Sequence, residues 1–222
     1  MAARLSEYAS LADLYEFLTP PALLTPEGNV AAFAPWLPPA PARVLDCACG
    51  IGLLAAGLAH VGYDAHASDI SPDMVARTRA LGVAAEVRSW DELPPSGDFD
   101  VVLCVGNSLA HARDRRVGLR AMAGALKPGG TLLVTSRNWE LEQPGGTEVV
   151  ERDGRRATIT RVWTPGRPTR LELTVDTVTE VLTVWPFTHA ELLDDLRAAG
   201  LEPTDSTHTS DCERYLLRAH VR

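Results

Sequence analysis

Two aspartates stand at the ends of successive strand-like segments and are the first candidates for chemistry. Asp46 is followed by small residues over positions 47–52, which lead into a helical pattern, and Asp69 closes the next strand-like segment. A glycine-rich turn before a helix lets the backbone approach a ligand, and a carboxylate at the second strand end can accept two hydrogen bonds from ribose hydroxyls. The two acids therefore indicate a site for a cofactor that contains a nucleoside.

Two classes of cofactor could use this turn. From Gly50 the sequence GIGLLA fits the G-x-G-x-x-A fingerprint of dinucleotide-binding proteins. Asp46 argues against that class because a carboxylate repels a neighbouring pyrophosphate, whereas a sulfonium cofactor with an ammonium group tolerates the charge. The sequence therefore favours S-adenosylmethionine, with a nicotinamide oxidoreductase as the alternative.

Four motifs follow one another between about residues 40 and 140. They read VLDCACGIG, SDISPDM, FDVVLCVGNSLAH and LKPGGTLLVTSRNW. In this combination the chain resembles the class I S-adenosylmethionine-dependent methyltransferases, and within them the glycine and sarcosine N-methyltransferase-like group. The resemblance implies an enzyme that transfers a methyl group from S-adenosyl-L-methionine to a small molecule.

The resemblance also implies which residues hold the cofactor. Positions matching the first motif line the methionine portion, Asp69 and Ile70 hold the ribose and adenine, and Ser89-Trp90 falls at an adenine contact. The expected cofactor-binding residues are Asp46, Ala48, Gly50, Gly52, Asp69, Ile70, Met74, Ser89, Trp90, Val105 and Gly106. Structural roles stay open beside these: Ala48 as a packing residue of the turn, Trp90 as a buried loop aromatic, and both aspartates as solubilising strand-end acids.

The segment from Val105 to His111 follows the fourth strand, whose tip faces the methyl donor in this fold. His111 is the candidate general base, with a hydrogen-bonding role at a helix start as the alternative. By motif position the resemblance assigns Asn107 and Arg137 to the substrate, and Arg137 could instead form a structural ion pair. A lone asparagine without a carboxylate at this tip cannot chelate magnesium, so we expect no metal.

Aromatic residues complete the expected acceptor site. Tyr8 and Tyr15 are seven residues apart on one helix face and could cover the acceptor or pack in the core. Trp139-Glu140 stands where glycine enzymes carry tyrosine and aspartate, which weakens the case for glycine itself. Candidates for a substrate wall, each of which could also be a packing residue, are Trp139, Trp163, Trp185 and His189. The expected acceptor-site residues are His111, Asn107 and Tyr15 in catalysis and Tyr8, Asn107, Arg137, Trp139 and Trp185 in substrate binding.

Charge and composition restrict the partners. The chain has 222 residues and a formal net charge of −8, so no global positive field exists to gather nucleic acid or anionic membrane. The arginines within 113–120 could grip RNA phosphate, but without interleaved aromatics we expect a solvated helix face. The cysteines form no disulfide or zinc framework, and we find no targeting signal. We expect a cytoplasmic protein with a small-molecule acceptor, no nucleic-acid or membrane partner, and a homo-oligomer left open.

The elements that must position these residues follow from hydrophobic periodicity. Strand-like segments alternate with helical ones in the way that is typical of βαβ units. The strands are expected at 43–46, 63–68, 83–88, 101–105 and 131–136, and the helices at 1–18, 29–36, 52–62, from 71, 115–126 and 188–199. Alternating segments at 147–152, 157–163 and 170–185 indicate an antiparallel insertion. The final strands are expected at 201–205 and 214–221.

The predicted fold class is α/β, a doubly wound Rossmann-like seven-stranded methyltransferase sheet with an antiparallel β insertion before the last helix. We expect one methyltransferase domain over 1–222. Its predicted parts are an N-terminal helical lid (1–41), a cofactor-binding core (42–137), a substrate-side insertion (138–187) and a closing helix with a β-hairpin (188–222).

The expected reaction is metal-independent, in-line methyl transfer to a small molecule, with an amine nitrogen as the favoured acceptor. The richness in Ala, Arg and Pro suggests natural-product biosynthesis in a high-GC bacterium. Carbon methylation of an electron-rich aromatic such as an indole is the first alternative. A non-catalytic regulator that binds S-adenosylmethionine is the second.

Overall fold

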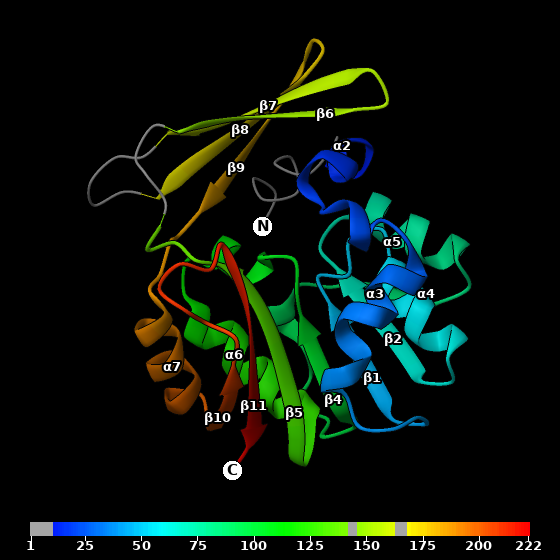
Figure 1. Cartoon of the computed structure of the whole chain (residues 1–222). Helices are drawn as coiled ribbons and strands as arrows, with labels where there is room; N and C mark the ends of the chain where they lie inside the picture. Colours follow the sequence, from blue (N-terminus) through cyan, green and yellow to red (C-terminus); the bar gives the residue numbers. More distant parts are fainter. Residues whose placement is uncertain (1–10, 142–145, 163–167) are drawn as a thin grey trace.

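The computed structural model describes residues 11–141, 146–162 and 168–222. They form a seven-stranded mixed sheet flanked by helices and, above one edge of it, a four-stranded antiparallel sheet (Figure 1). The large sheet has the strand order β10-β11-β5-β4-β1-β2-β3. The predicted α/β fold class with an antiparallel insertion is therefore confirmed.

The order of the parallel strands creates the place for a site. These strands are β1 (Arg43–Cys47), β2 (Asp64–Asp69), β3 (Ala84–Val87), β4 (Phe99–Cys104) and β5 (Leu126–Arg137). β10 (Leu201–Ser206) and β11 (Arg214–Val221) extend the sheet beyond β5 as antiparallel strands. β1 pairs with both β2 and β4, so the chain reverses its direction of winding beside β1. Open α/β sheets bind ligands at such a switch point, outside the carboxyl ends of the strands.

Helices cover both faces of the large sheet. One face carries α3 (Pro26–Phe33), α4 (Leu53–His60) and α5 (Pro72–Ala80), and the other carries α6 (Arg115–Ala125) and α7 (His189–Ala198). The predicted helix starts at Ser71 and Thr188 are confirmed. The Ser71 hydroxyl accepts the Met74 N–H, and Thr188 forms a reciprocal capping box with Glu191. Such caps satisfy backbone N–H groups that have no partner within the helix.

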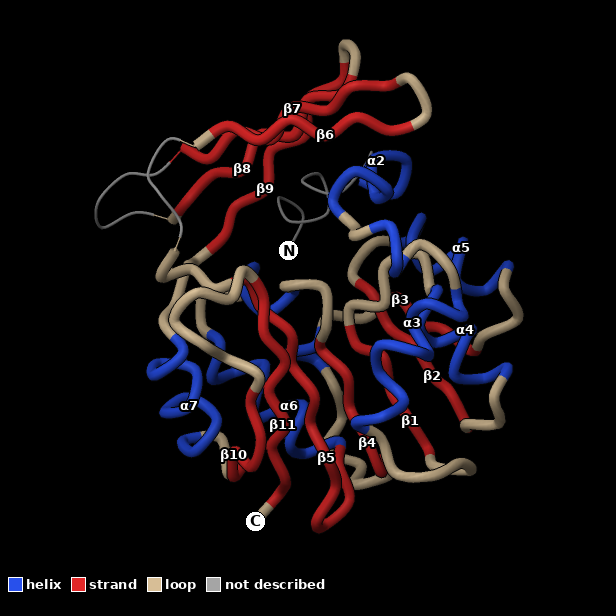
Figure 2. Tube along the Cα trace, viewed as in Figure 1, coloured by secondary structure: helices blue, strands red, loops and turns tan. Residues whose placement is uncertain are grey.

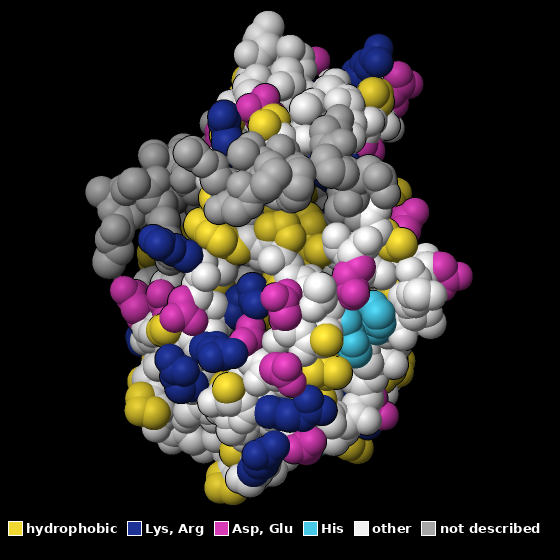
Figure 3. Space-filling view, turned by 90° about the vertical axis from the view of Figure 1, so that its left-hand side faces the viewer, with side chains coloured by type: hydrophobic (Ala, Val, Ile, Leu, Met, Phe, Trp, Pro, Cys, Tyr) yellow, Lys and Arg dark blue, Asp and Glu magenta, His cyan; other side chains and the backbone are white. Residues whose placement is uncertain are grey.

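Ion pairs join α6 to α7 on the outer face. Asp195 lies 2.8 Å from an Arg115 guanidinium nitrogen and 2.7 Å from Nε of Arg116. Two members of the predicted arginine cluster are therefore used in helix packing. Figure 3 shows basic and acidic side chains interspersed on this side of the molecule, as expected of a solvated face rather than a phosphate-binding patch.

The insertion is a four-stranded antiparallel sheet. Its strands are β6 (Thr147–Arg152), β7 (Arg155–Val162), β8 (Thr169–Val175) and β9 (Val178–Val184). Asp153-Gly154 forms the turn between β6 and β7, with positive φ at both residues. The segment 170–185, expected as one strand-like stretch, is instead two strands joined at Asp176, whose φ is 54°. Asp-Thr is a weaker hairpin signal than Asp-Gly, so the alternating pattern concealed this turn.

Helix α2 (Leu11–Leu18) is attached to the insertion sheet (Figure 2). Leu14 and Phe17 pack with buried β7 and β8 residues in one apolar cluster. The Arg152 guanidinium donates to the backbone carbonyls of Glu16 and Thr19. Part of the predicted first helix is thus confirmed, and residues 1–10, with Tyr8, lie outside the described residues.

Two further features bear on the sequence predictions. The strand expected at 131–136 begins earlier, at Leu126, and its pairing with β4 is irregular there, because the pairing of Phe99 with Leu126 is followed by that of Val101 with Thr131. No helix in the described part of the chain is long and apolar enough to cross a membrane.

The Asp195 contacts make a stability prediction. Asp195→Asn leaves two guanidinium groups without their carboxylate, and the Arg115 side chain is only 15% exposed. We expect the free energy of unfolding to fall by roughly 2 to 4 kcal/mol, measured by urea denaturation. Asp194→Asn is the matched control, because this neighbouring side chain is 75% exposed in its pair with Arg197. Equal losses in the two variants would contradict the structural role of Asp195.

Candidate active site

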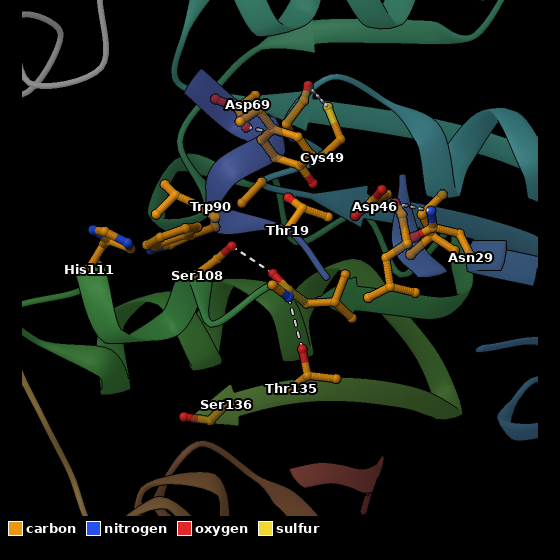
Figure 4. A pocket seen from close by; sticks show the side chains of 18 of the residues that line it. Thr19, Asn29, Asp46, Cys49, Asp69, Trp90, Ser108, His111, Thr135 and Ser136 are labelled. Carbon is orange, nitrogen blue, oxygen red and sulfur yellow. Dashed lines mark hydrogen bonds between the residues drawn. The ribbon is translucent and has the colours of Figure 1, made fainter. Parts of the chain in front are cut away.

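One cavity of about 540 Å³ opens at the switch point (Figure 4). Residues from the ends of β1, β2, β4 and β5 form its floor, and α2, the strand β9 and the start of β11 supply walls. A volume of this size suits a cofactor or a small-molecule ligand. Ten of the eleven predicted cofactor residues line the cavity: Asp46, Ala48, Gly50, Asp69, Ile70, Met74, Ser89, Trp90, Val105 and Gly106.

The turn after β1 brings its backbone against Asp69. Ala48 N–H donates to the carbonyl of Ser68 at 2.7 Å, and Gly50 N–H donates to Oδ2 of Asp69 at 3.0 Å. Ala48 has a φ of 68° and Gly50 a φ of 56°. A Cβ on Gly50 would lie 2.9 Å from the Tyr15 ring, so glycine lets α2 close over this turn.

Gly52, the remaining predicted residue of the motif, is absent from the cavity lining. It has a φ of 82° immediately before α4, and a Cβ there would lie 2.6 Å from the Thr78 side chain. The glycine therefore permits close packing of α4 against α5. Gly52 thus serves the motif as the N-cap residue of α4 and does not itself contact the cavity.

Asp46 is a buried carboxylate with an unbalanced charge. Its side chain is 1% exposed, and Oδ1 has no hydrogen-bond partner among the described residues. Burial, and secondarily the charge of Asp69, raise the pKa of Asp46 to about 7. A cationic ligand group would balance this charge, which is the chemistry of an ammonium or sulfonium.

Asp69 presents a different carboxylate. Its oxygens accept backbone N–H groups from Ser71 at 2.9 Å and from Gly50 at 3.0 Å. Burial raises the pKa of Asp69, and the backbone hydrogen bonds oppose that shift. Each oxygen keeps acceptor capacity for a ligand hydroxyl. The acid pair therefore fits the amino-acid and ribose portions of S-adenosylmethionine.

Trp90 and the β4 tip close the cavity on the α6 side. Trp90 packs on Gly118 of α6, where a Cβ would lie 2.8 Å from the indole ring. Gly106 N–H donates to the Thr135 hydroxyl at 2.8 Å, and the Ser108 hydroxyl donates to the Val105 carbonyl at 2.7 Å (Figure 4). These bonds hold the turn after β4 against β5 and give the cavity a fixed wall.

His111 lines the cavity together with Trp185. Burial lowers the pKa of His111 to about 4, and a hydrogen bond with the Thr183 backbone opposes that shift. The backbone N–H of Trp185 donates to the Ala110 carbonyl at 2.7 Å, which joins the insertion to the turn that carries His111. The imidazole is therefore neutral near pH 7 and is held by the strand that closes the site.

Three predicted acceptor-site residues do not line the cavity. Asn107 uses its Oδ1 to accept the Arg137 backbone N–H at 3.0 Å. The Arg137 guanidinium lies 3.9 Å from Glu148, in the ion pair that was the alternative reading. Trp139 is 8% exposed and packs in the main apolar core. The structure therefore brings Tyr15, His111 and Trp185 together but leaves these three outside, and Trp163 lies outside the described residues.

Other cavity residues had not been predicted. The segment before β1 contributes residues that include Asn29, Phe33 and Trp36, and the C-terminal part contributes Thr207, Arg214, Tyr215 and Leu216. The four-motif pattern ends near residue 140 and gives no signal for them. The antiparallel pairing of β11 with β5 places Arg214 opposite Arg137, and only that register reveals the C-terminal wall.

Comparisons with known proteins agree with this geometry. Residues 44–130 match the family model described as a methyltransferase domain. The CcbJ methyltransferase from Streptomyces caelestis has the same fold, with a TM-score of 0.83, 20% identity and coverage of 97% of both chains. The sugar N-methyltransferase KedS8 from Streptoalloteichus sp ATCC 53650 is 25% identical, with a TM-score of 0.67 over 92% of this chain and 88% of that one.

A curated relative shares part of the sequence. The ubiquinone biosynthesis O-methyltransferase of Xanthomonas axonopodis pv. citri (strain 306) is 41% identical over 110 residues, which are 46% of this chain and 46% of that protein. The chain thus spans a little under half the length of the curated relatives it matches. Residues 44–130 are thus similar to a methyltransferase domain, and the predicted methyl donor, S-adenosyl-L-methionine, is confirmed.

The raised pKa of Asp46 predicts proton release on cofactor binding. At pH 6 the free carboxyl is mostly protonated, since its pKa is about 7, and a bound ammonium group drives it to ionise. We expect close to one proton released per S-adenosylmethionine at pH 6, and a smaller number as the pH rises through 7. Calorimetry in buffers of different ionisation enthalpy measures this number. S-adenosylhomocysteine, which keeps the ammonium, should behave alike, and Asp46→Asn should release none.

The same group predicts a pH dependence of stability without ligand. The pKa of Asp46 is about 7 in the folded chain against 3.8 in the unfolded one, so its favourable contribution is complete below pH 3.8 and is lost as pH rises through 7. Between pH 6 and pH 8 the wild type should lose roughly 1 kcal/mol relative to Asp46→Asn. Urea denaturation measures this difference. A difference in the free energy of unfolding between the two proteins that is the same at pH 6 and pH 8 would refute the assignment.

Proposed function

We propose that this chain transfers the methyl group of S-adenosylmethionine to an amine nitrogen of a small molecule. The observation that carries the proposal is the neutral His111 in the wall of a cavity that also holds the buried Asp46 and the half-buried Asp69. When bound, S-adenosylmethionine supplies a methyl group on a positively charged sulfur. The chain must then hold a neutral amine with its lone pair free and keep water away.

His111 suits the positioning of an amine. The hydrogen bond with Thr183 occupies one side of the imidazole, and the neutral ring keeps a nitrogen that can accept a hydrogen bond from an amine N–H. A base with a pKa of about 4 does not retain the proton of an alkylammonium, so that proton passes on to solvent. We therefore assign His111 to orienting the nucleophile.

Aromatic side chains shield the reacting groups. Tyr15 covers the turn at Gly50, and Trp185 and Tyr215 line the same cavity. Burial raises the pKa of Tyr215 to about 12, so its hydroxyl remains protonated at neutral pH. We propose that these rings form the acceptor wall and that the acceptor is not glycine, because Asn107 and Arg137 lie outside the cavity lining.

A hydroxyl acceptor is the second candidate, because the curated relatives are O-methyltransferases. The chemistry of His111 favours nitrogen over oxygen. A phenol must lose its proton to become a good nucleophile, and a base with a pKa of about 4 removes it poorly, whereas a neutral amine already carries its lone pair. The structural relatives include a sugar N-methyltransferase and an amino pentose methyltransferase. Methylation of an aromatic carbon is the third candidate.

The product identifies the acceptor atom. The chain is incubated with S-adenosylmethionine carrying a ¹³C-labelled methyl group and a panel of amino sugars, amino acids, phenols and indoles. We expect the labelled carbon to appear in an N-methyl product by NMR and mass spectrometry. Label on oxygen or on ring carbon would overturn the amine assignment, and binding of the cofactor without any labelled product would overturn the enzymatic assignment.

Substitution of His111 tests its orienting role. His111→Ala should lower kcat about 100-fold while leaving the Kd for S-adenosylhomocysteine nearly unchanged. In the wild type, the acidic limb of kcat/KM should follow the pKa of the amine used, since His111 is already neutral above about pH 5. An acidic limb that stays near pH 6.5 for acceptors of different basicity would show that His111 titrates as the base.

A further inference from the structure

Arg214 occupies the part of the cavity wall remote from the two acids. It begins β11 and lines the cavity, and it has no ion pair among the described residues. The sheet order places β11 three strands from β1, which corresponds to about 14 Å at the spacing of neighbouring strands. The cavity therefore has an acidic side at Asp46 and a basic side at Arg214.

Two further arginines stand behind Arg214. The register of β11 on β5 places Arg214 directly opposite Arg137, an arrangement of like charges that costs stability. Arg161 of β7 lies 2.8 Å from Glu148, and Arg137 lies 3.9 Å from the same carboxylate oxygen. Glu148 thus contacts both guanidinium groups, and the hydrogen bond from Arg161 is the main cause of its lowered pKa.

Arg214 lines the cavity as an exposed residue, so its charge stays accessible to a ligand. Desolvation is the largest cause of its lowered pKa, and the charges of Arg137 and Arg161 add to it, while Glu148 and the exposed Glu213 oppose it. The other arginine of the cavity wall, Arg88, is already paired with Glu86 at 2.7 Å. Of the two described arginines that line the cavity, Arg214 is therefore the one available to bind an anionic group of the ligand.

We propose that Arg214, supported by Arg137 and Arg161, binds a carboxylate or phosphate group of the methyl acceptor. A guanidinium binds either group through two parallel hydrogen bonds. The inference deepens the proposed function and rests on it: the substrate is an amine that also carries an anionic group, with the amine toward His111 and the anion toward β11. On a chain with a net charge of −8, such a local basic side also selects against acceptors that are purely cationic.

Matched acceptors test the proposal. We compare kcat/KM for an amino sugar with that of its phosphate ester, and for a β-amino acid with that of its amide. The anionic member of at least one pair should be preferred by about tenfold or more, and the preferred pair distinguishes phosphate from carboxylate. In Arg214→Gln this preference ratio should fall by about tenfold, and Arg214→Lys should keep part of it.

Arg120→Gln is the control. It removes the same charge from an exposed arginine of α6 outside the cavity lining, and it should leave the ratio unchanged. Equal use of both members of each pair by the wild type, or equal ratios in wild type and Arg214→Gln, would overturn the proposal.

A binding measurement keeps the two hypotheses separable. Inorganic phosphate and acetate are titrated separately into each protein, and thermal unfolding is followed at constant ionic strength, with chloride as the reference anion. One of the two anions should raise the Tm of the wild type and of Arg120→Gln but not of Arg214→Gln. If no amine is methylated, the proposed function fails and this titration alone decides the arginine site. Identical Tm shifts in all three proteins would refute it.

Discussion

The charge of Asp46 is the constraint on which the rest of the structure depends. A carboxylate at 1% exposure, on a central strand and beside Asp69, is unfavourable unless a ligand supplies the opposite charge. Its position is fixed by the sheet, because β1 pairs with both β2 and β4. The cavity, its acidic side and its preference for a cationic ligand all follow from placing this acid at the switch point.

The wall opposite this acid comes from elements that are remote in sequence. The turn after β4 carries His111, β9 carries Thr183 and β11 carries Arg214, and all three residues line one cavity. The backbone hydrogen bond between Trp185 and Ala110 joins the insertion to the core at this point. In the proposed function, the core therefore supplies the cofactor side of the cavity, and the late elements supply the acceptor side.

Most residues predicted to bind the cofactor line one cavity, because local patterns in the sequence define that part of the fold. Apolar strands, the caps at Ser71 and Thr188, and acids at strand ends each depend on neighbouring residues, so they can be recognised without long-range information. The acceptor half depends on strand register and on packing between distant segments. Asn107 and Trp139 have the right chemistry for substrate contact, but one holds a strand end and the other fills the core.

Two other differences have the same origin. The turn at Asp176 lacks glycine, so the alternation of polar and apolar residues continues through it and gives no sign of a turn. The place of Arg214 in the cavity wall follows from its pairing opposite Arg137, which the sequence does not reveal. In both cases the deciding fact is the pairing of strands, which no single segment encodes. Composition and periodicity were sufficient for the layers of the fold and insufficient for the residues on the acceptor wall.

The attachment of α2 to the insertion has a consequence for how acceptor recognition can diversify. Arg152 holds the end of this helix through the backbone carbonyls of Glu16 and Thr19, and these acceptors persist whatever side chains the helix carries. Leu14 and Phe17 bind the insertion sheet, while Tyr15 points to the cavity turn. The groups that anchor this short helix are thus different from the side chain that faces the cavity. Substitutions on its cavity side can reshape the pocket without releasing the helix from its support.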